Sequence, residues 1–185
     1  MPSEKEKMLA GELYDASDPR LTSERQNAEA LTSWYNETAP EATDRRRQLL
    51  GELFGSLGDG AVVEPPFRCD YGSTVHVGDD CYANVDCVFL DVCRIDVGRH
   101  CLVGPGVHLY TATHPLDAET RAEGPEYGRP ISIGDDVWIG GRAVVNPGIS
   151  VGDRSVVGSG TVVTEDVPDD VVVQGNPAQV IKELA

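Results

Sequence analysis

The side chains of this sequence best suited to chemistry are four histidines and five cysteines. An imidazole exchanges protons near neutral pH and binds metals, and a thiol can act as a nucleophile or a zinc ligand. His76 and His108 alternate with aliphatic residues and are expected to point outward, whereas His100 falls in a turn. His114 lies in a segment without such a pattern, so the periodicity gives it no structural place. No serine accompanies a histidine in the pattern of a nucleophile elbow, so nothing indicates nucleophilic catalysis by serine.

The cysteines indicate packing rather than metal binding. They are Cys69, Cys81, Cys87, Cys93 and Cys101, and the spacings of six, six and eight from Cys81 onward match no zinc pattern. Three histidines that could converge on a zinc ion are not apparent either. An odd number of cysteines without a signal peptide is typical of free thiols in a reducing compartment. We therefore expect a cytoplasmic protein that needs no metal.

The charge of the chain limits its partners. Its 185 residues carry a formal net charge of −16, which argues against binding nucleic acid or an anionic membrane. No apolar run is long enough to span a bilayer. Lysine occurs only at Lys5, Lys7 and Lys182, against 31 acidic residues. This composition is typical of proteins from salt-loving organisms, where high ionic strength screens the repulsion between like charges.

Residues 1–58 are predicted to form a helical cap. Ser3 and Glu6 have the spacing of a capping box, and Asp18 before Pro19 is typical of a helix start. Apolar residues mark a second helix up to about residue 38 and a third from residue 40 to the glycines at 55 and 58. Their apolar stripes are expected to dock on the rest of the protein.

A period of six residues dominates the remainder, residues 59–185. Steps of six from Ile133 give Ile139, Val145, Val151, Val157 and Val163, with a second aliphatic or small series two residues earlier. The period is visible from Val75 onward, with a slip of two residues near Ile95, and it places every cysteine except Cys69 on inward positions. A hexad cannot bury its apolar face alone, but three hexads form a triangular coil and stacked coils share a core. The pattern therefore predicts a mainly β fold, a parallel β-helix.

One segment interrupts this period. Residues 111–130, TATHPLDAETRAEGPEYGRP, contain no aliphatic pair at hexad spacing and include His114. We expect a loop that projects from the coil. Long loops on a rigid scaffold are where functional residues concentrate.

An ordered set of motifs resembles the maltose and galactoside O-acetyltransferases, nearer to the maltose type. The motifs are EKEKMLAGELYD, FRCDYGSTVHVG, CYANVDCVFLDVC, GPGVHLYTATHPLD, GDDVWIGGRAVVNPGISVGD and VVTEDVPDDVVVQGNPAQVIKEL, and together they span nearly the whole chain. The resemblance implies a left-handed β-helix, an exception to the usual right-handed crossover. It also implies a homotrimer with active sites between subunits, and acetyl transfer from acetyl-CoA to a hydroxyl of a small sugar such as maltose or glucose.

The resemblance assigns roles on the acceptor side. His114 matches the catalytic histidine, which would take the proton of the attacking hydroxyl, a contribution of roughly 10²–10⁴ in rate. Asn84 matches the residue that assists it and binds the sugar. Carboxylates and hydroxyls suit a sugar because they form hydrogen bonds with its hydroxyls. The further candidates for binding the acceptor are Asp70, Tyr82, Asp91, Glu126 and Asp18. Asp91 and Asp18 are the weaker matches.

The resemblance also assigns the coenzyme A side. A backbone N–H near Gly141 would bind the oxyanion of the tetrahedral intermediate, and Trp138 would pack beside the thioester arm. Glu165 and Gln179 stand where the family usually has lysine and arginine, so two positive charges near the expected phosphates are missing. The candidates for coenzyme A binding are Trp138, Gly141, Arg142, Ser159, Thr164, Glu165, Gln179 and Lys182.

Two alternatives remain from the sequence. The same acetyl transfer could serve a non-sugar acceptor or a glycan intermediate. The coil could also be a catalytically silent assembly module, an alternative that the missing basic residues favour and that the presence of Asn84 and His114 opposes.

Overall fold

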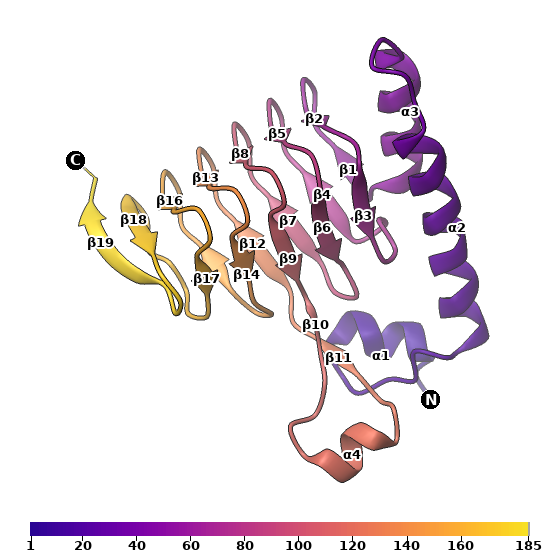
Figure 1. Cartoon of the computed structure of the whole chain (residues 1–185). Coiled ribbons are helices and arrows are strands. Elements are labelled where there is room, and N and C mark those ends of the chain that lie inside the picture. Colours follow the sequence, from indigo (N-terminus) through magenta and orange to yellow (C-terminus); the bar gives the residue numbers. More distant parts are fainter. Residues whose placement is uncertain (185) are drawn as a thin grey trace.

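The N-terminal segment is helical, as the sequence predicts. The computed structural model describes residues 1–184 and begins with α1 (Glu4–Ala10), α2 (Pro19–Asn36) and α3 (Thr43–Leu53). Ser3 and Glu6 form the reciprocal capping box of α1, and the Asp18 carboxylate accepts hydrogen bonds from the N–H groups of Arg20 and Leu21 at the start of α2. Helices α2 and α3 lie at the first end of a regular stack of strands, and α1 lies beside the base of the loop formed by residues 111–130 (Figure 1).

The stack is a parallel β-helix whose successive coils lie side by side (Figure 1). Each coil passes through three sheets. Sheet 1 holds β1 (Ser56–Leu57), β4 (Val75–Val77), β7 (Ile95–Val97), β12 (Ile131–Ile133) and β15 (Ser150–Val151). Sheet 2 holds β2 (Val62–Val63), β5 (Tyr82–Ala83), β8 (Leu102–Val103), β13 (Trp138–Ile139), β16 (Val156–Val157), β18 (Val171–Gln174) and β19 (Gln179–Glu183). Sheet 3 holds β3 (Phe67–Cys69), β6 (Cys87–Leu90), β9 (His108–Tyr110), β14 (Val144–Val145) and β17 (Val162–Val163).

The hexad residues form the core of this coil, as predicted. Ile133, Ile139, Val145, Val157 and Val163 are all buried in one continuous cluster. Neighbouring coils pair in parallel and in register, so identical positions of successive coils stack. The prediction of a mainly β protein with hexapeptide repeats, a helical N-terminus and a projecting loop is confirmed.

The coil begins earlier than the six-residue series suggested. Strands β1 to β3 already form a coil between residues 56 and 69, before Val75. Helix α3 ends at Leu53, and Gly58 belongs to the coil: a Cβ there would lie 2.3 Å from the carbonyl carbon of Gly78. This glycine allows two turns to stack closely, rather than ending a helix as its position had suggested.

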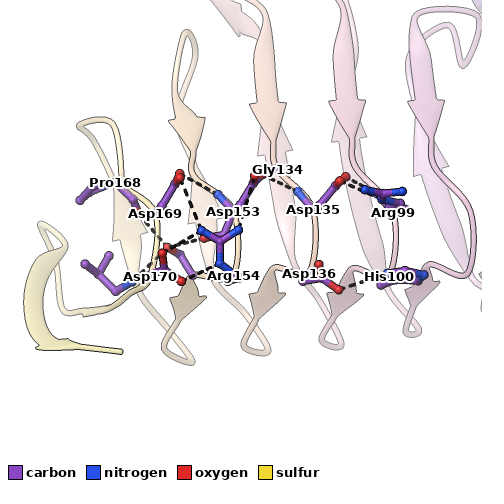
Figure 2. A network of polar contacts seen from close by, with 12 residues as sticks. Arg99, His100, Gly134, Asp135, Asp136, Asp153, Arg154, Pro168, Asp169 and Asp170 are labelled. Carbon is purple, nitrogen blue, oxygen red and sulfur yellow. Dashed lines mark hydrogen bonds and ion pairs between the residues drawn. The ribbon is translucent and has the colours of Figure 1, made fainter. Parts of the chain in front are cut away.

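Three corners connect the sheets, named here by their order in a coil. The first corner joins sheets 1 and 2, the second joins sheets 2 and 3, and the third leads from sheet 3 to the next coil. At the first corner, carboxylates link successive turns (Figure 2). Asp153 accepts a hydrogen bond from the N–H of Asp135 at 2.8 Å, and the Arg154 guanidinium forms a two-bond ion pair with Asp170.

The projecting loop leaves the coil at the third corner (Figure 1). Its two ends pair as the antiparallel strands β10 (Ala112–Thr113) and β11 (Tyr127–Gly128), and a short helix, α4 (Ala118–Ala122), forms its tip. Asp117 caps α4 by accepting from the N–H of Thr120. Arg121 donates to the carbonyls of Pro115 and Leu116, at 3.1 and 3.0 Å, so these contacts order the tip.

A second apolar cluster lies where the cap, the loop and the coil meet. It consists of Met8, Tyr14, Leu21, Tyr71 and Val92. Cys93 is buried beside it, and its thiol donates to the carbonyl of Met8 at 3.2 Å.

The expected inward position of Cys93 in the coil is therefore wrong, because the two-residue slip turns it toward the cap. Cys81, Cys87 and Cys101 do lie in the coil core.

Candidate active site

His114 lies at the base of the projecting loop, directly after β10. Half of its side chain is exposed, 53%, and its Nε2 lies 3.9 Å from Oε2 of Glu126 on the returning arm of the loop. The antiparallel pairing of β10 with β11 brings these two residues together. An exposed imidazole beside a carboxylate can take up a proton and keep the resulting positive charge partly balanced.

Tyr14 connects Glu126 to the helical cap. The two residues form an isolated antiparallel bridge, and the Tyr14 hydroxyl donates to Oε1 of Glu126. Only 19% of the Glu126 side chain is exposed. Its carboxylate is therefore held in place between the cap and His114.

Asp70 adds a second carboxylate to this region. It follows β3 at the third corner, and burial raises its pKa to about 6, with further contributions from Asp91 and Glu126, while Arg25 opposes the shift. A carboxyl group with this pKa is mostly ionised at neutral pH, and it can accept hydrogen bonds from a polyhydroxyl ligand.

Asp91 and Asp18 are two of the candidates for binding the acceptor, but their carboxylates accept hydrogen bonds from backbone N–H groups. Asp91 is completely buried: its Oδ1 accepts from the N–H groups of Asp70 and Tyr71, both at 2.9 Å, and its Oδ2 from the Thr74 hydroxyl at 2.6 Å. Burial raises the pKa of Asp91 to about 6 against the effect of these hydrogen bonds. Asp18 caps α2. The structure therefore places Asp91 beneath Asp70 as part of its support.

A groove of about 650 Å³ opens beside Asp70, between α2 and sheet 3. Its lining includes Asn36, Arg68 and Arg25. The Arg25 guanidinium donates to the Tyr71 hydroxyl and to the Ala16 carbonyl, both at 2.7 Å.

Arg25 is not among the residues that the motifs single out. Its signal is nevertheless present in the helical period, because it falls on the stripe of α2 whose other members are buried. These members are Leu21, Ala28, Thr32 and Tyr35. A charge on such a stripe needs a partner, here the hydroxyl of Tyr71 and a carbonyl.

The second corner gathers a different set of candidates. Asn84, Gly141 and Ser159 occupy this corner in three different coils, and Arg142 follows Gly141. The turns are joined along the stack: the N–H of Arg142 donates to the Pro105 carbonyl at 2.8 Å, and that of Gly160 donates to Gly141 at 3.0 Å. Within residues 1–184 the N–H of Gly141 itself has no acceptor. This N–H is the group that the resemblance assigns to the oxyanion.

Tyr82 and Trp138 lie on the outer face of sheet 2, next to the second corner. Leu102 on β8 lies between them and is paired with each, so the three side chains form one exposed apolar row. Gln179 and Lys182 lie on β19 at the end of the same sheet. Thr164 and Glu165 follow β17 and are exposed at the third corner.

The predicted residues therefore fall into two groups on each chain. One group, with His114, Glu126 and Asp70, lies at the third corner beside the cap. The other, with Tyr82, Asn84, Trp138, Gly141, Arg142 and Ser159, follows sheet 2 and the second corner, with Gln179 and Lys182 on its last strand. Sheet 3 separates the two groups. Asn84 and His114, matched together by motif, come from different corners.

The other histidines have structural contacts. His76 bonds to the Ser56 hydroxyl, His100 to Asp136 and His108 to the hydroxyl of Tyr110. Among the residues that the structure describes, no cluster of three or more His, Cys, Asp or Glu side chains could hold a metal ion. Across residues 1–184, none of the helices combines the length and apolarity needed to span a bilayer.

Comparisons with known proteins agree with this architecture. Residues 7–58 match the maltose acetyltransferase hexapeptide capping motif, and residues 130–165 match the hexapeptide repeat of succinyl-transferase. A maltose O-acetyltransferase structure from Clostridium difficile 630 is 48% identical with a TM-score of 0.98, covering 100% of this chain and 98% of that one. An acetyltransferase from Vibrio cholerae O1 biovar eltor, solved with acetyl coenzyme A, is 42% identical with a TM-score of 0.92 over 100% of both chains.

The galactoside O-acetyltransferase of Escherichia coli (strain K12) is 38% identical over 97% of this chain and 88% of that protein. Coil, cap and repeat thus define a hexapeptide-repeat acyltransferase. More specifically, the chain belongs to the maltose and galactoside O-acetyltransferase family and is an acetyltransferase. The resemblance inferred from the motifs is confirmed.

Proposed function

We propose that this protein transfers the acetyl group of acetyl-CoA to a hydroxyl of a small sugar of the maltose or glucose type, with His114 as general base. The observation that carries the proposal is the position of His114, half exposed at the base of the loop and facing the carboxylate of Glu126 at 3.9 Å. The imidazole would accept the hydroxyl proton while the oxygen attacks the thioester carbonyl. Coenzyme A thiolate would then leave.

Polar groups at the third corner suit a polyhydroxyl acceptor. Asp70 and Glu126 supply carboxylate oxygens, and the groove beside Asp70 adds the Arg25 guanidinium, while the Asn36 amide in its lining is bonded to the backbone of Phe67. Carboxylates accept hydrogen bonds from sugar hydroxyls, and guanidinium groups donate them. This set favours a sugar over an apolar acceptor.

The separation of the two groups supports a homotrimer with composite sites. Tyr82 lies on sheet 2 and Asn84 at the second corner, whereas His114 of the same chain follows the third corner. A neighbouring copy that brings its sheet 2 against the third corner would join them, and it would cover the exposed apolar row of Tyr82, Leu102 and Trp138. Each site would then take its base from one subunit and its Asn84 from the next.

The second corner supports acetyl-CoA binding. The unpaired N–H of Gly141 would stabilise the oxyanion, with Trp138 and Ser159 along the same edge. The solved Vibrio cholerae relative carries acetyl coenzyme A. Thr164 and Glu165, at the third corner, would contact the cofactor from the adjacent subunit, and Arg142 and Lys182 supply positive charge.

The test is thiol release from acetyl-CoA with a panel of sugars and non-sugar acceptors, at low and high potassium chloride. The acid-rich composition supports the expectation that the protein works in the cytoplasm of a salt-loving organism. We expect His114→Ala to lower kcat by at least about 100-fold. His100→Ala is the matched control, since His100 is equally exposed, 52%, but lies at the first corner. Near-normal turnover by His114→Ala, with the control active, would refute the mechanism.

A further inference from the structure

Tyr14 has a position that none of the roles above uses. It lies in the link between α1 and α2, and only 2% of its surface is exposed. Its backbone pairs with Glu126 in both directions: Tyr14 N–H donates to Glu126 at 3.0 Å, and Glu126 N–H donates to Tyr14 at 3.3 Å. Its ring packs in the apolar cluster with Met8 and Leu21. Cap and loop are therefore already joined without the hydroxyl.

The hydroxyl makes a separate contact. It donates to Oε1 of Glu126, while Oε2 of the same carboxylate lies 3.9 Å from Nε2 of His114. Burial, followed by the Glu126 carboxylate, raises the pKa of Tyr14. The phenol consequently remains a donor throughout the working range of the enzyme. A carboxylate with one oxygen bound in this way cannot rotate freely, so its second oxygen keeps its direction.

We propose that Tyr14 is a positioning residue: its hydroxyl holds Glu126 so that the free carboxylate oxygen faces His114 and stabilises the positive charge that the imidazole acquires. The inference rests on the proposed function of His114 as general base. An opposite charge at about 4 Å stabilises an imidazolium more than a neutral imidazole, so the contact acts mainly in the transition state. Glu126 would thereby serve the base as well as the acceptor.

A purely structural role for Tyr14 makes a different prediction. If the hydroxyl only fastened the cap to the loop, its loss would lower the stability of the fold and leave kcat unchanged. Tyr14→Phe separates the two roles because the backbone bridge and the ring contacts remain. Tyr35→Phe is the matched control: Tyr35 is equally buried, and its hydroxyl donates to the Val63 carbonyl at the far end of α2.

The experiment compares steady-state kinetics and thermal unfolding of Tyr14→Phe, Tyr35→Phe and the parent protein. A hydrogen bond to a charged group is worth enough to change a rate by about tenfold or more. We therefore expect Tyr14→Phe to lower kcat by about tenfold and to leave the KM for acetyl-CoA within about twofold. Tyr35→Phe should lower the melting temperature without lowering kcat.

A double-mutant cycle completes the test. Glu126→Gln removes the charge that Tyr14 positions, so adding Tyr14→Phe to it should cause no further loss of kcat. Unchanged kcat in Tyr14→Phe, or independent and additive losses in the cycle, would overturn the inference. His114→Ala separates failure of this inference from failure of the proposed function. If His114→Ala stays active, the proposed function fails. If His114→Ala is inactive and Tyr14→Phe is fully active, only the role of Tyr14 is removed.

Discussion

The second and third corners of the coil differ in how far the repeat dictates their geometry. At the second corner the turns of four successive coils each contain a residue with positive φ whose N–H donates to a carbonyl of the preceding coil, namely Asp86, Gly106, Arg142 and Gly160. At the third corner the loop leaves the coil and the cap packs against it (Figure 1). The repeated turns of the second corner thus place backbone donors at a fixed spacing. At the third corner, where the loop interrupts the coil, charged side chains from distant segments come together, such as Glu126 and Asp70.

The electrostatic consequences differ in the same way. At the third corner, burial raises the pKa values of Asp70 and Asp91 to about 6, and the carboxylates of Asp91 and Glu126 add to the shift of Asp70. At the first corner, by contrast, the Arg154 guanidinium lowers the pKa of Asp170. Regular turns therefore use their charges to hold the stack together, while the third corner keeps carboxylates at a cost in stability, as expected of a binding site.

The largest predicted effect concerns the regular corner. A Cβ on Gly140 would lie 2.6 Å from the backbone nitrogen of Ser159, so Gly140→Ala must push two turns apart. Overpacking of this kind costs up to about 3 kcal/mol, and we expect a loss of that size in urea unfolding. Gly51→Ala in α3 is the control, because a Cβ there meets nothing within 4 Å.

The control should stabilise the protein by up to about 1 kcal/mol, since alanine favours a helix more than glycine does. If Gly140→Ala were as stable as Gly51→Ala, the turns of the second corner would tolerate displacement, and the view that repetition fixes the spacing of their backbone donors would fail.

The next prediction concerns Asp70. Its pKa in the folded chain, about 6, lies above the ordinary value of 3.8, so the folded state binds this proton more tightly than the unfolded state does. Ionisation of Asp70 therefore lowers stability, which decreases as pH rises from about 4 to about 6 and stays low above that range. Asp70→Asn should stabilise the fold by about 1 kcal/mol at pH 7.5, a value reduced for partial exposure to water, and by little at pH 4.

Urea unfolding at the two pH values checks this, and the KM for the sugar should rise in the same variant. Asp170→Asn is the control of opposite sign. Its pKa is lowered in the fold by Arg154, so its ionised form contributes stability that is lost as pH falls. Destabilisation by Asp70→Asn at pH 7.5 would contradict the view that the third corner trades stability for binding.

Much of the regular part could be predicted from the sequence. A period of six with glycines at the turns has few structural solutions, so the sheets, the core and the loop followed from it. The caps at Ser3 and Asp18 were local signals and were equally readable. His114 could be singled out because it lies where the period breaks and because its motif matches that of the resembled family.

The irregular part could not be predicted in this way, because its contacts join distant segments. Nothing near Tyr14 in the sequence points to Glu126, 112 residues away, and the contact arises only when the loop folds back on the cap. Cys93 has the spacing of an inward residue, but the slip turns its buried side chain away from the coil core and toward the cap. Arg25 lies on the buried face of α2 because it bonds to Tyr71, a tertiary partner that the local sequence does not indicate.

The smallest predicted effect concerns the exposed edge where the two corners of neighbouring subunits would meet. Glu165 is exposed and follows β17 beside Thr164, and the resemblance places coenzyme A phosphates near it. Glu165→Lys exchanges repulsion for attraction at a solvent-exposed position, where one such pair is worth less than about 1 kcal/mol. We therefore expect the KM for acetyl-CoA to decrease by about threefold at low salt, with kcat unchanged, and the gain to vanish in concentrated potassium chloride because screening shortens the Debye length to about 3 Å. Glu41→Lys makes the same charge change on the cap and should leave this KM unaltered. An equal decrease in both variants would attribute the effect to net charge alone and would remove Glu165 from the cofactor site.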